Sequence, residues 1–328
     1  MSLNNVRKQQ QRNLLAESED TMADEKILFH LSVSPHIHAK HTTGSIMCEV
    51  LLALTPAAIF SVFYFGIRVL LVYAVCMGSS VLAEYVWQKC TKQKVTIKDC
   101  SALVTGMLLA MNLPASIPLW MAAIGSIFAI IIVKQIFGGI GQNFMNPALA
   151  ARCFMLVAWA SAMTNFTVQG VSTATPMTII KTGGELPSLL NTFLGTVSGS
   201  LGETSAILLL IGGIYLIVRG IIDWTLPVTY IAVVLVLSYA FGHDGLYEVL
   251  SGGLMLVAFF MATDYTTSPM TRKGRIIMGI GCGLLTALIR TFGGYPEGVS
   301  FSILLMNICV PLIDRISMPK IYGEVKSK

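Results

Sequence analysis

The strongest constraint on the fold is a series of apolar runs, each close to the length of a helix that crosses a bilayer. Such a helix needs about 20 mostly apolar residues. Runs of this kind occur ten times in the 328 residues, at 45–65, 67–88, 99–113, 117–135, 146–163, 204–222, 224–242, 246–263, 274–291 and 298–315. Only 12% of the residues are charged, about half the share in soluble domains. We therefore predict an all-α polytopic membrane protein with about ten transmembrane helices, of which the third is short and ends before Pro114.

The positions of the basic residues predict how these helices are oriented. Eighteen of the 22 Lys and Arg residues lie in segments on the side of the N-terminus, three lie on the other side, and Arg152 lies within the fifth run. Basic residues collect on the cytoplasmic side of membrane proteins. We therefore expect both termini in the cytoplasm and residues 164–203 outside it. The net charge of +5 then reflects membrane topology and not a nucleic-acid partner. We expect no signal peptide in residues 1–26, because they are polar and lack an apolar stretch.

Similar features in the two halves predict an internal repeat. Phe137-Gly138-Gly139 and Phe292-Gly293-Gly294 each close the fourth run of their half. Because each half has five runs, an odd number, the halves must be inverted relative to each other, and such repeats place their sites near the midplane. The expected organisation is a cytoplasmic segment (1–44), a five-helix repeat (45–163), an extracytoplasmic loop (164–203), a second five-helix repeat (204–315) and a cytoplasmic tail (316–328).

Three segments together give the chain a family resemblance. They are Ser34-Pro35-His36-Ile37, the glycine-rich block 137–149, which ends Asn146-Pro147-Ala148-Leu149, and Ser172-Thr173-Ala174-Thr175-Pro176 in the long loop. In this order they resemble the NqrB/RnfD family, over about residues 29–322. These proteins are membrane subunits of the sodium-pumping NADH:quinone reductase and of the Rnf ferredoxin:NAD⁺ oxidoreductase.

The resemblance implies a covalent flavin in the loop. In the family, FMN is joined by a phosphoester to the last threonine of a Ser-x-Ala-Thr motif, which here consists of Ser172, Ala174 and Thr175. A threonine hydroxyl can receive a phosphate but cannot carry electrons, so the cofactor does the redox chemistry. A flavin-attaching transferase is implied as a partner, and a flexible outer loop would let it reach Thr175. Without the resemblance, the same stretch is an ordinary solvated connection.

The resemblance also implies a second, noncovalent flavin, riboflavin. Gly139 and Gly141 precede a predicted helix start, where backbone N–H groups, with Asn143 and Asn146, can hydrogen-bond a flavin ring. The alternative is a tight turn entering a membrane helix. Arg152 either extends its charge toward the membrane surface or pairs with a flavin phosphate or a partner's carboxylate.

Acidic residues within spans suggest an ion path, because they are costly there. Glu49 and Asp264 are the candidates, and ion pairs between helices or boundary positions are the alternative. We expect Glu84 to pair with Lys89. We interpret three histidines, His36, His38 and His41, as interfacial residues, and the seven cysteines as inert core thiols. We therefore predict no metal site.

The predicted function is that of a flavin-carrying subunit of an ion-translocating oxidoreductase in the bacterial cytoplasmic membrane. It would relay electrons between ferredoxin and NAD⁺ modules and couple this relay to Na⁺ or H⁺ movement. The sequence contains no nicotinamide fold and no cluster motif, so we assign no catalytic residue and expect the other subunits of the complex as partners. The repeat alone would favour a solute channel or secondary transporter, whereas the glycine-rich block and the Thr175 loop favour the redox subunit.

Overall fold

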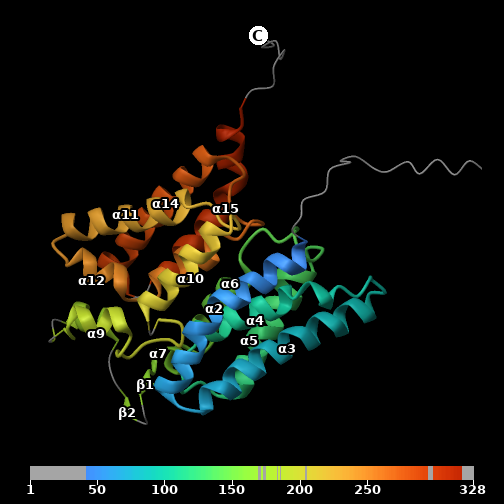
Figure 1. Ribbon diagram of the computed structural model, residues 1–328, viewed down its shortest axis with the longest axis horizontal. Coiled ribbons are helices and arrows are strands. Elements are labelled where there is room, and N and C mark those ends of the chain that lie inside the picture. Colours follow the sequence, from blue (N-terminus) through green and yellow to red (C-terminus); the bar gives the residue numbers. More distant parts are fainter. Residues whose placement is uncertain are drawn as a thin grey trace, which may run out of the picture. The chain divides into compact units, whose positions relative to one another are not determined.

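Long apolar helices dominate the computed structural model, which describes residues 42–168, 171–172, 175–182, 184, 186–203, 205–294 and 298–319. Within these residues, four helices are long and apolar enough to cross a membrane (Figure 1): α2 (Thr43–Phe65), α3 (Arg68–Cys90), α14 (Arg272–Phe292) and α15 (Val299–Ser317). The chain is therefore a multi-pass α-helical membrane protein. The motif 34–37, the three histidines, Thr173, Ala174 and the end of the tail lie outside the described residues.

The other predicted runs fall on shorter helices. These are α4 (Ser101–Met111), α5 (Leu119–Phe128), α6 (Pro147–Ala158), α10 (Ala206–Val218) and α11 (Thr225–Ala240). A π-helical segment, η2 (Ala129–Gln135), continues α5. The eighth run is divided into α12 (Gly245–Leu250), α13 (Leu254–Leu256) and the π-helical η3 (Val257–Met261). Each predicted run thus lies on one helix or on a chain of shorter ones.

The long connection between α6 and α10 is folded, where the sequence predicted a flexible loop. It contains α7 (Ala160–Thr164), α8 (Pro176–Thr182), α9 (Leu189–Leu194) and an antiparallel pair, β1 (Thr167–Val168) with β2 (Val171–Ser172). Side-chain oxygens of Thr175 and Ser188 accept hydrogen bonds from the first turns of α8 and α9. Buried apolar residues such as Met177 and Leu201 fix the segment to the helices.

Helix α4 ends inside the protein, and the segment before α10 completes its hydrogen bonds. The carbonyls of Met111 and Leu113 accept from the N–H groups of Gly202 and Leu201 at 2.6 and 3.0 Å. Unpaired backbone groups are costly at membrane depth, so this pairing makes the interruption tolerable. A Cβ at Gly202 would lie 2.9 Å from the Met111 carbonyl oxygen, so a side chain does not fit there.

A second break separates α12 from α13 and is held by a buried arginine. Gly252 and Gly253 have positive φ (68° and 70°), which glycine adopts readily. The Arg290 guanidinium donates to the carbonyls of Glu248, Ser251 and Gly252 at 2.7, 3.4 and 3.2 Å. One side chain from α14 thereby satisfies backbone groups left free at the end of α12.

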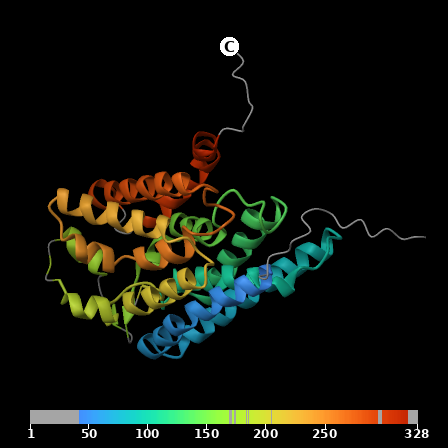
Figure 2. The same ribbon diagram turned by 45° about the horizontal axis from the view of Figure 1, so that its top comes forward.

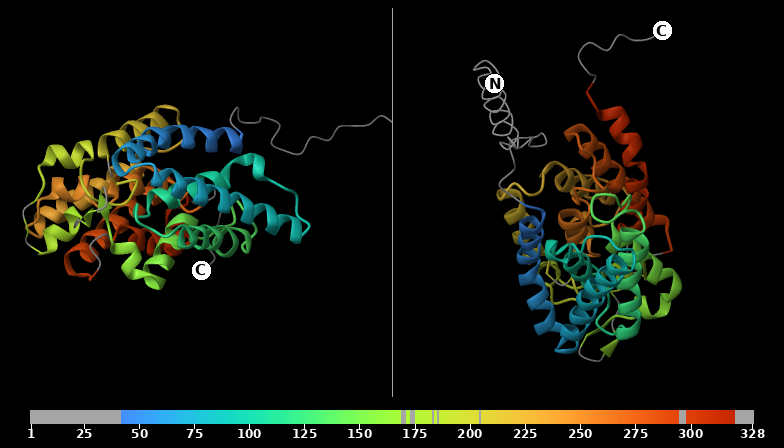
Figure 3. Two further views of the ribbon diagram at one scale, coloured as in Figure 1. Left: turned by 90° about the horizontal axis from the view of Figure 1, so that it is seen from below. Right: turned by 90° about the vertical axis from the view of Figure 1, so that its right-hand side faces the viewer.

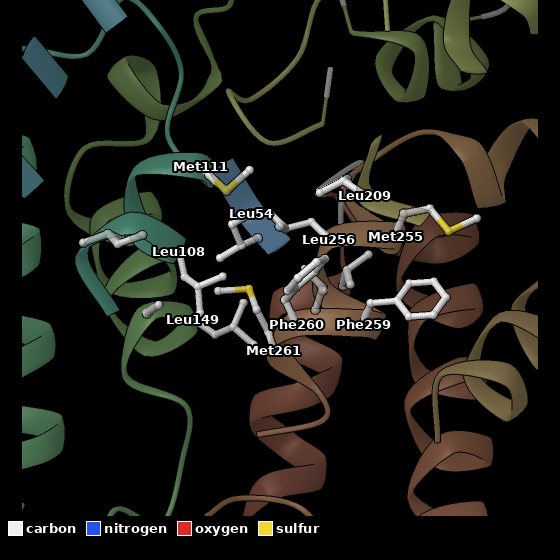
Figure 4. Close-up of a cluster of buried hydrophobic side chains, with 14 of the residues drawn as sticks. Leu54, Leu108, Met111, Leu149, Leu209, Met255, Leu256, Phe259, Phe260 and Met261 are labelled. Carbon is white, nitrogen blue, oxygen red and sulfur yellow. The ribbon is translucent and has the colours of Figure 1, made fainter. Parts of the chain in front are cut away.

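The helices pack in two groups that share a core. In the first group, α3 contacts α4 and α5; in the second, α11 contacts α12 and α14, which also packs on α15 (Figure 2). The groups meet where α2 contacts α10 (Figure 3) and where α6 contacts α15. Buried side chains from both groups, including Leu54, Leu149 and Phe260, form one hydrophobic cluster (Figure 4).

The outer surface is apolar and several charges are inside, which is the reverse of a water-soluble domain. Phe63 and Ile67 are 83% and 81% exposed, whereas Glu84, Lys134 and Arg290 are at most 3% exposed. The apolar surface suits contact with lipid, and the buried charges must be satisfied within the protein.

Candidate functional sites

A cavity of about 180 Å³ lies between the two helix groups and brings together three of the residues singled out from the sequence. Its walls include Asn143, Asn146 and Asp264. We call it the central cavity; α2, α4, η2, α10 and η3 also contribute to it, through residues such as Ile46, Met47, Ser101, Thr105, Lys134, Leu216, Phe259 and Phe260. About 10–15 Å³ of such volume is enough to hold one water molecule, so this cavity can hold several.

The two asparagines at this cavity differ in which of their side-chain atoms already form hydrogen bonds within the protein. Asn146 caps α6, because its Oδ1 accepts from the N–H groups of Ala148 and Leu149 at 3.0 and 3.3 Å, and its Nδ2 donates to the Met261 carbonyl at 3.1 Å. Asn143 donates from Nδ2 to the Met145 carbonyl and to Thr266 Oγ1, both at 3.1 Å. Asn143 is therefore the better candidate for a ligand contact.

The glycines before α6 form a turn. Gly138, Gly139 and Gly141 have φ of 114°, 92° and 88°. Residues other than glycine rarely adopt such values. Neither Gly139 nor Gly141 lines the central cavity, whereas Ile140 and Asn143 of the same turn do. The glycines thus shape the backbone that presents Asn143.

A buried ion pair lies at the wall of the central cavity, and its partners differ from those expected. Glu84 pairs with Lys134, whose Nζ lies 3.1 and 3.0 Å from the two carboxylate oxygens and 2.6 Å from Ser101 Oγ. Gln135 also donates to Glu84, at 2.9 Å. The expected pairing with Lys89 is wrong: the Lys89 Nζ lies 5.6 Å from the centre of the Tyr85 ring. In the sequence, Lys134 stood out only as a basic residue at the end of a span.

Asp264 follows η3 and faces the cavity with a hydroxyl partner. Its Oδ2 accepts from Thr266 Oγ1 at 3.0 Å. Burial raises the pKa of this carboxyl, and the hydrogen bonds from Thr266 and the charge of Lys134 offset part of that rise. A carboxyl group in such surroundings holds a proton more readily than one in water.

Glu49, the other ion-path candidate, lies outside the central cavity. Tyr215 donates a hydrogen bond to it, and Arg219 forms an ion pair with it. These contacts join α2 to α10, as expected for an ion pair between helices.

Thr175 is buried, although an accessible position was expected from the sequence. It is 3% exposed. Its Oγ1 lies 2.8 Å from Thr178 Oγ1 and accepts from the Thr178 N–H at 3.3 Å, so the side chain caps the first turn of α8. The backbone of Ser172 ends β2, one residue before the undescribed pair 173–174.

A second, smaller cavity of about 50 Å³ has Arg152 and Thr178 in its wall. Thr175 does not line it and is connected to it through the hydroxyl of Thr178. Arg152 does not extend to the surface. It donates to Asn112 Oδ1 at 2.8 Å and Ser300 Oγ at 3.1 Å, and its Nη2 lies 3.6 Å from Glu203 Oε1. This residue therefore joins α4, α6, α15 and the segment before α10.

The two cavities lie toward opposite ends of the helices. The central cavity lies near the start of α2. The other end of α2 leads into the turn that begins α3, where Arg68 donates to the Ser116 carbonyl at 3.1 Å. Ser116 Oγ in turn donates to the carbonyl of Asn165, which follows α7. The segment containing Thr175 continues from there. The two candidate flavin positions are thus separated along the helix direction.

These features define a multi-pass α-helical membrane protein with an internal cavity near one end of its helices and a buried threonine, Thr175, near the other. The chain belongs to the NQR2, RnfD, RnfE family, whose model matches residues 30–323. It is 52% identical over 306 residues to the D subunit of the Na⁺-translocating ferredoxin:NAD⁺ oxidoreductase complex of Acetobacterium woodii, covering 91% of this chain and 96% of that protein. It is 47% identical to the D subunit of the proton-translocating ferredoxin:NAD⁺ oxidoreductase complex of Clostridium ljungdahlii, covering 91% and 97%. It is 35% identical to the D subunit of the ion-translocating oxidoreductase complex of Escherichia coli O127:H6, covering 92% and 100%.

Proposed function

We propose that this chain is the flavin-carrying membrane subunit of an ion-translocating ferredoxin:NAD⁺ oxidoreductase. It relays electrons between partner subunits that bind ferredoxin and NAD⁺, and it takes part in coupling this relay to Na⁺ or H⁺ movement across the bacterial cytoplasmic membrane. The names of the relatives, matched over nearly their whole length, support the class of complex. The observation that carries the flavin proposal is the contact of Thr175, the last residue of its Ser-x-Ala-Thr motif, with Thr178, which lines the Arg152 cavity.

Thr175 would hold FMN through a phosphoester on its Oγ1. The bound flavin would supply one- and two-electron redox chemistry that the side chains lack. Arg152 and Thr178 stand at the smaller cavity, and a guanidinium group favours a phosphate. Because the hydroxyl is buried, the transferase must reach it before α8 packs or while this segment is open.

Two variants test whether Thr175 is the residue that carries FMN. Thr175→Asn keeps a capping oxygen, since asparagine is a good N-cap residue, but removes the hydroxyl that forms the phosphoester. Thr178→Ala removes the neighbouring hydroxyl and keeps the proposed acceptor. In protein produced with the flavin-attaching transferase, Thr175→Asn should lose flavin fluorescence in a denaturing gel and Thr178→Ala should keep it. Fluorescence that persists in Thr175→Asn would place the flavin elsewhere.

We propose the central cavity as the place of a noncovalent flavin, with Asn143 as its amide contact. The supporting features are the size of the cavity and the turn that presents this amide. Asn143→Leu should lower the riboflavin released on denaturation by several-fold while the covalent flavin remains. Gln142→Leu, an exposed change in the same turn, is the matched control. Full riboflavin content in Asn143→Leu would show that the flavin binds elsewhere.

For the ion path, we place Asp264 ahead of Glu49. Asp264 faces the central cavity, while Glu49 is engaged by Tyr215 and Arg219. The coupling ion is not assigned by similarity, because the relatives at 52% and 47% identity are named for Na⁺ and protons respectively. The choice between the two ions therefore depends on local chemistry.

We also propose that the two helix groups are inverted repeats with both termini in the cytoplasm. Each group contains a short helix followed by a break, α4 in one and α12 in the other. Each has a buried acid next to a basic residue, Glu84 with Lys134 and Glu248 with Arg290. The second candidate function is that of a solute channel or transporter, which the central cavity between the groups favours. Finding Thr175 unmodified would support this alternative.

A further inference from the structure

Two cysteines far apart in the sequence have their sulfurs in contact. Cys48 of α2 and Cys100, which precedes α4, are 52 positions apart, and their Sγ atoms lie 3.9 Å from each other. The sequence had suggested inert core thiols. We propose that Cys48 and Cys100 are a redox-sensitive pair that small disulfides convert into an intramolecular disulfide bond.

The backbone around the pair brings the two segments together. The start of α2 packs against the turn η1 (Ile97–Asp99), and a Cβ on Gly44 would lie 3.5 Å from the Lys98 carbonyl oxygen. To form a bond of about 2.05 Å, the sulfurs must approach by roughly 1.9 Å. Cys100 lies in a short turn and not in a helix, with φ of 59°, so side-chain rotation and a small adjustment of this turn can supply that movement.

The pair is also more accessible than the core thiols. Cys48 is exposed and Cys100 half-buried, whereas Cys76, Cys153 and Cys282 are buried. Because Cys48 is the more exposed of the two, a small disulfide is expected to react with it first.

The chemistry is thiol–disulfide exchange and needs only a small disulfide as oxidant. The Cys48 thiolate attacks one sulfur of the reagent, forming a mixed disulfide and releasing one thiol equivalent. The Cys100 thiolate then attacks the Cys48 sulfur, closing the protein disulfide and releasing the second equivalent. Two protein thiols are oxidised, one reagent disulfide is reduced, and the two protons leave with the released thiols.

The bridge would join two walls of the central cavity. Ile46 and Met47 lie just before Cys48, and Ser101 lies just after Cys100; all three line the cavity. Oxidation would therefore restrict how far the start of α2 can separate from the start of α4. This inference does not depend on the flavin or on the coupling ion.

The test uses the complete complex in membrane vesicles, treated with the membrane-permeant disulfide dithiodipyridine and analysed by peptide mass spectrometry. The wild type should give a Cys48–Cys100 linked peptide that dithiothreitol cleaves. Cys48→Ser and Cys100→Ser should each leave a thiopyridyl adduct on the remaining cysteine, and Cys90→Ser, at another exposed cysteine, should keep the link. Wild-type protein in which Cys90 is modified while Cys48 and Cys100 stay free, or carry separate adducts, would overturn the proposal.

Discussion

At the residue scale, Asn146 and Thr175 each use a side-chain oxygen to cap the first turn of a helix. The sequence singled out both as cofactor-binding residues. A pattern of letters cannot separate these roles, because a helix cap and an anion or ligand contact at a helix start need the same oxygen and amide groups. The presence of Asn143, Asn146 and Asp264 at one cavity could not be derived either, since it depends on packing between segments more than 100 residues apart.

The raised pKa of Asp264 predicts a pH-dependent effect on stability. The folded protein holds the proton of this carboxyl more tightly than the unfolded chain, so its contribution to stability is complete below the unfolded pKa and is lost as pH rises through the folded pKa. Asp264→Asn stays neutral. It should therefore become more stable relative to the wild type as pH rises from about 4 to about 8.

Thermal unfolding of the purified complex at several pH values measures this difference. Asp244→Asn is the control, because Asp244 is exposed and caps α12, and asparagine caps equally well. A constant difference between Asp264→Asn and wild type across the pH range would contradict the expectation.

At the scale of elements, the sequence predicts where the apolar helices lie better than it predicts their interruptions. Pro114 indicated the end of α4. The break after α12 lies in a run that reads as continuous, and it is held by Arg290 from α14, about 40 residues later. The predicted pairing of Glu84 with Lys89 is wrong for a related reason. Lys89 lies five positions along the helix, beyond the three or four that bring side chains together, whereas Lys134 reaches Glu84 from η2.

Two helical glycines should respond differently to alanine. At Gly106 in α4, a Cβ would lie 2.7 and 2.8 Å from the Cys76 carbonyl oxygen and the Met77 Cα of α3, and backbone atoms cannot move aside cheaply. Gly106→Ala should destabilise the protein by about 1–3 kcal/mol. At Gly78 in α3 no atom lies within 4 Å of the new Cβ, so Gly78→Ala should be neutral or stabilising by up to ~1 kcal/mol. The unfolding midpoints of the two purified variants test the α3–α4 contact; equal midpoints would refute it.

At the scale of the whole molecule, the two proposed flavin positions near opposite ends of the helices would suit an electron relay across the membrane. The apolar runs and the family motif in the sequence are enough to indicate a membrane protein of this kind. The folding of the Thr175 segment onto the helix ends was not predicted, because its buried apolar residues are scattered among Thr, Ser and Gly and show no helical period.

The predicted orientation can be tested with natural and introduced cysteines. Cys90 is exposed at the end of α3, and Leu190 is 71% exposed in α9. In intact cells, an impermeant thiol reagent should label Leu190→Cys, while Cys90 should react only after the membrane is permeabilised. Labelling of Cys90 but not of position 190 in intact cells would reverse the orientation.

The central claim is that this chain carries electrons through a flavin bound to its own Thr175. Peptide mass spectrometry of the complex, purified from cells that also make the flavin-attaching transferase, tests it most directly. We predict one FMN phosphoester per chain, with fragment ions that place it on Thr175 and not on Ser172, Thr173 or Thr178. A peptide spanning residues 171–182 that is recovered fully unmodified from an active complex would contradict this claim.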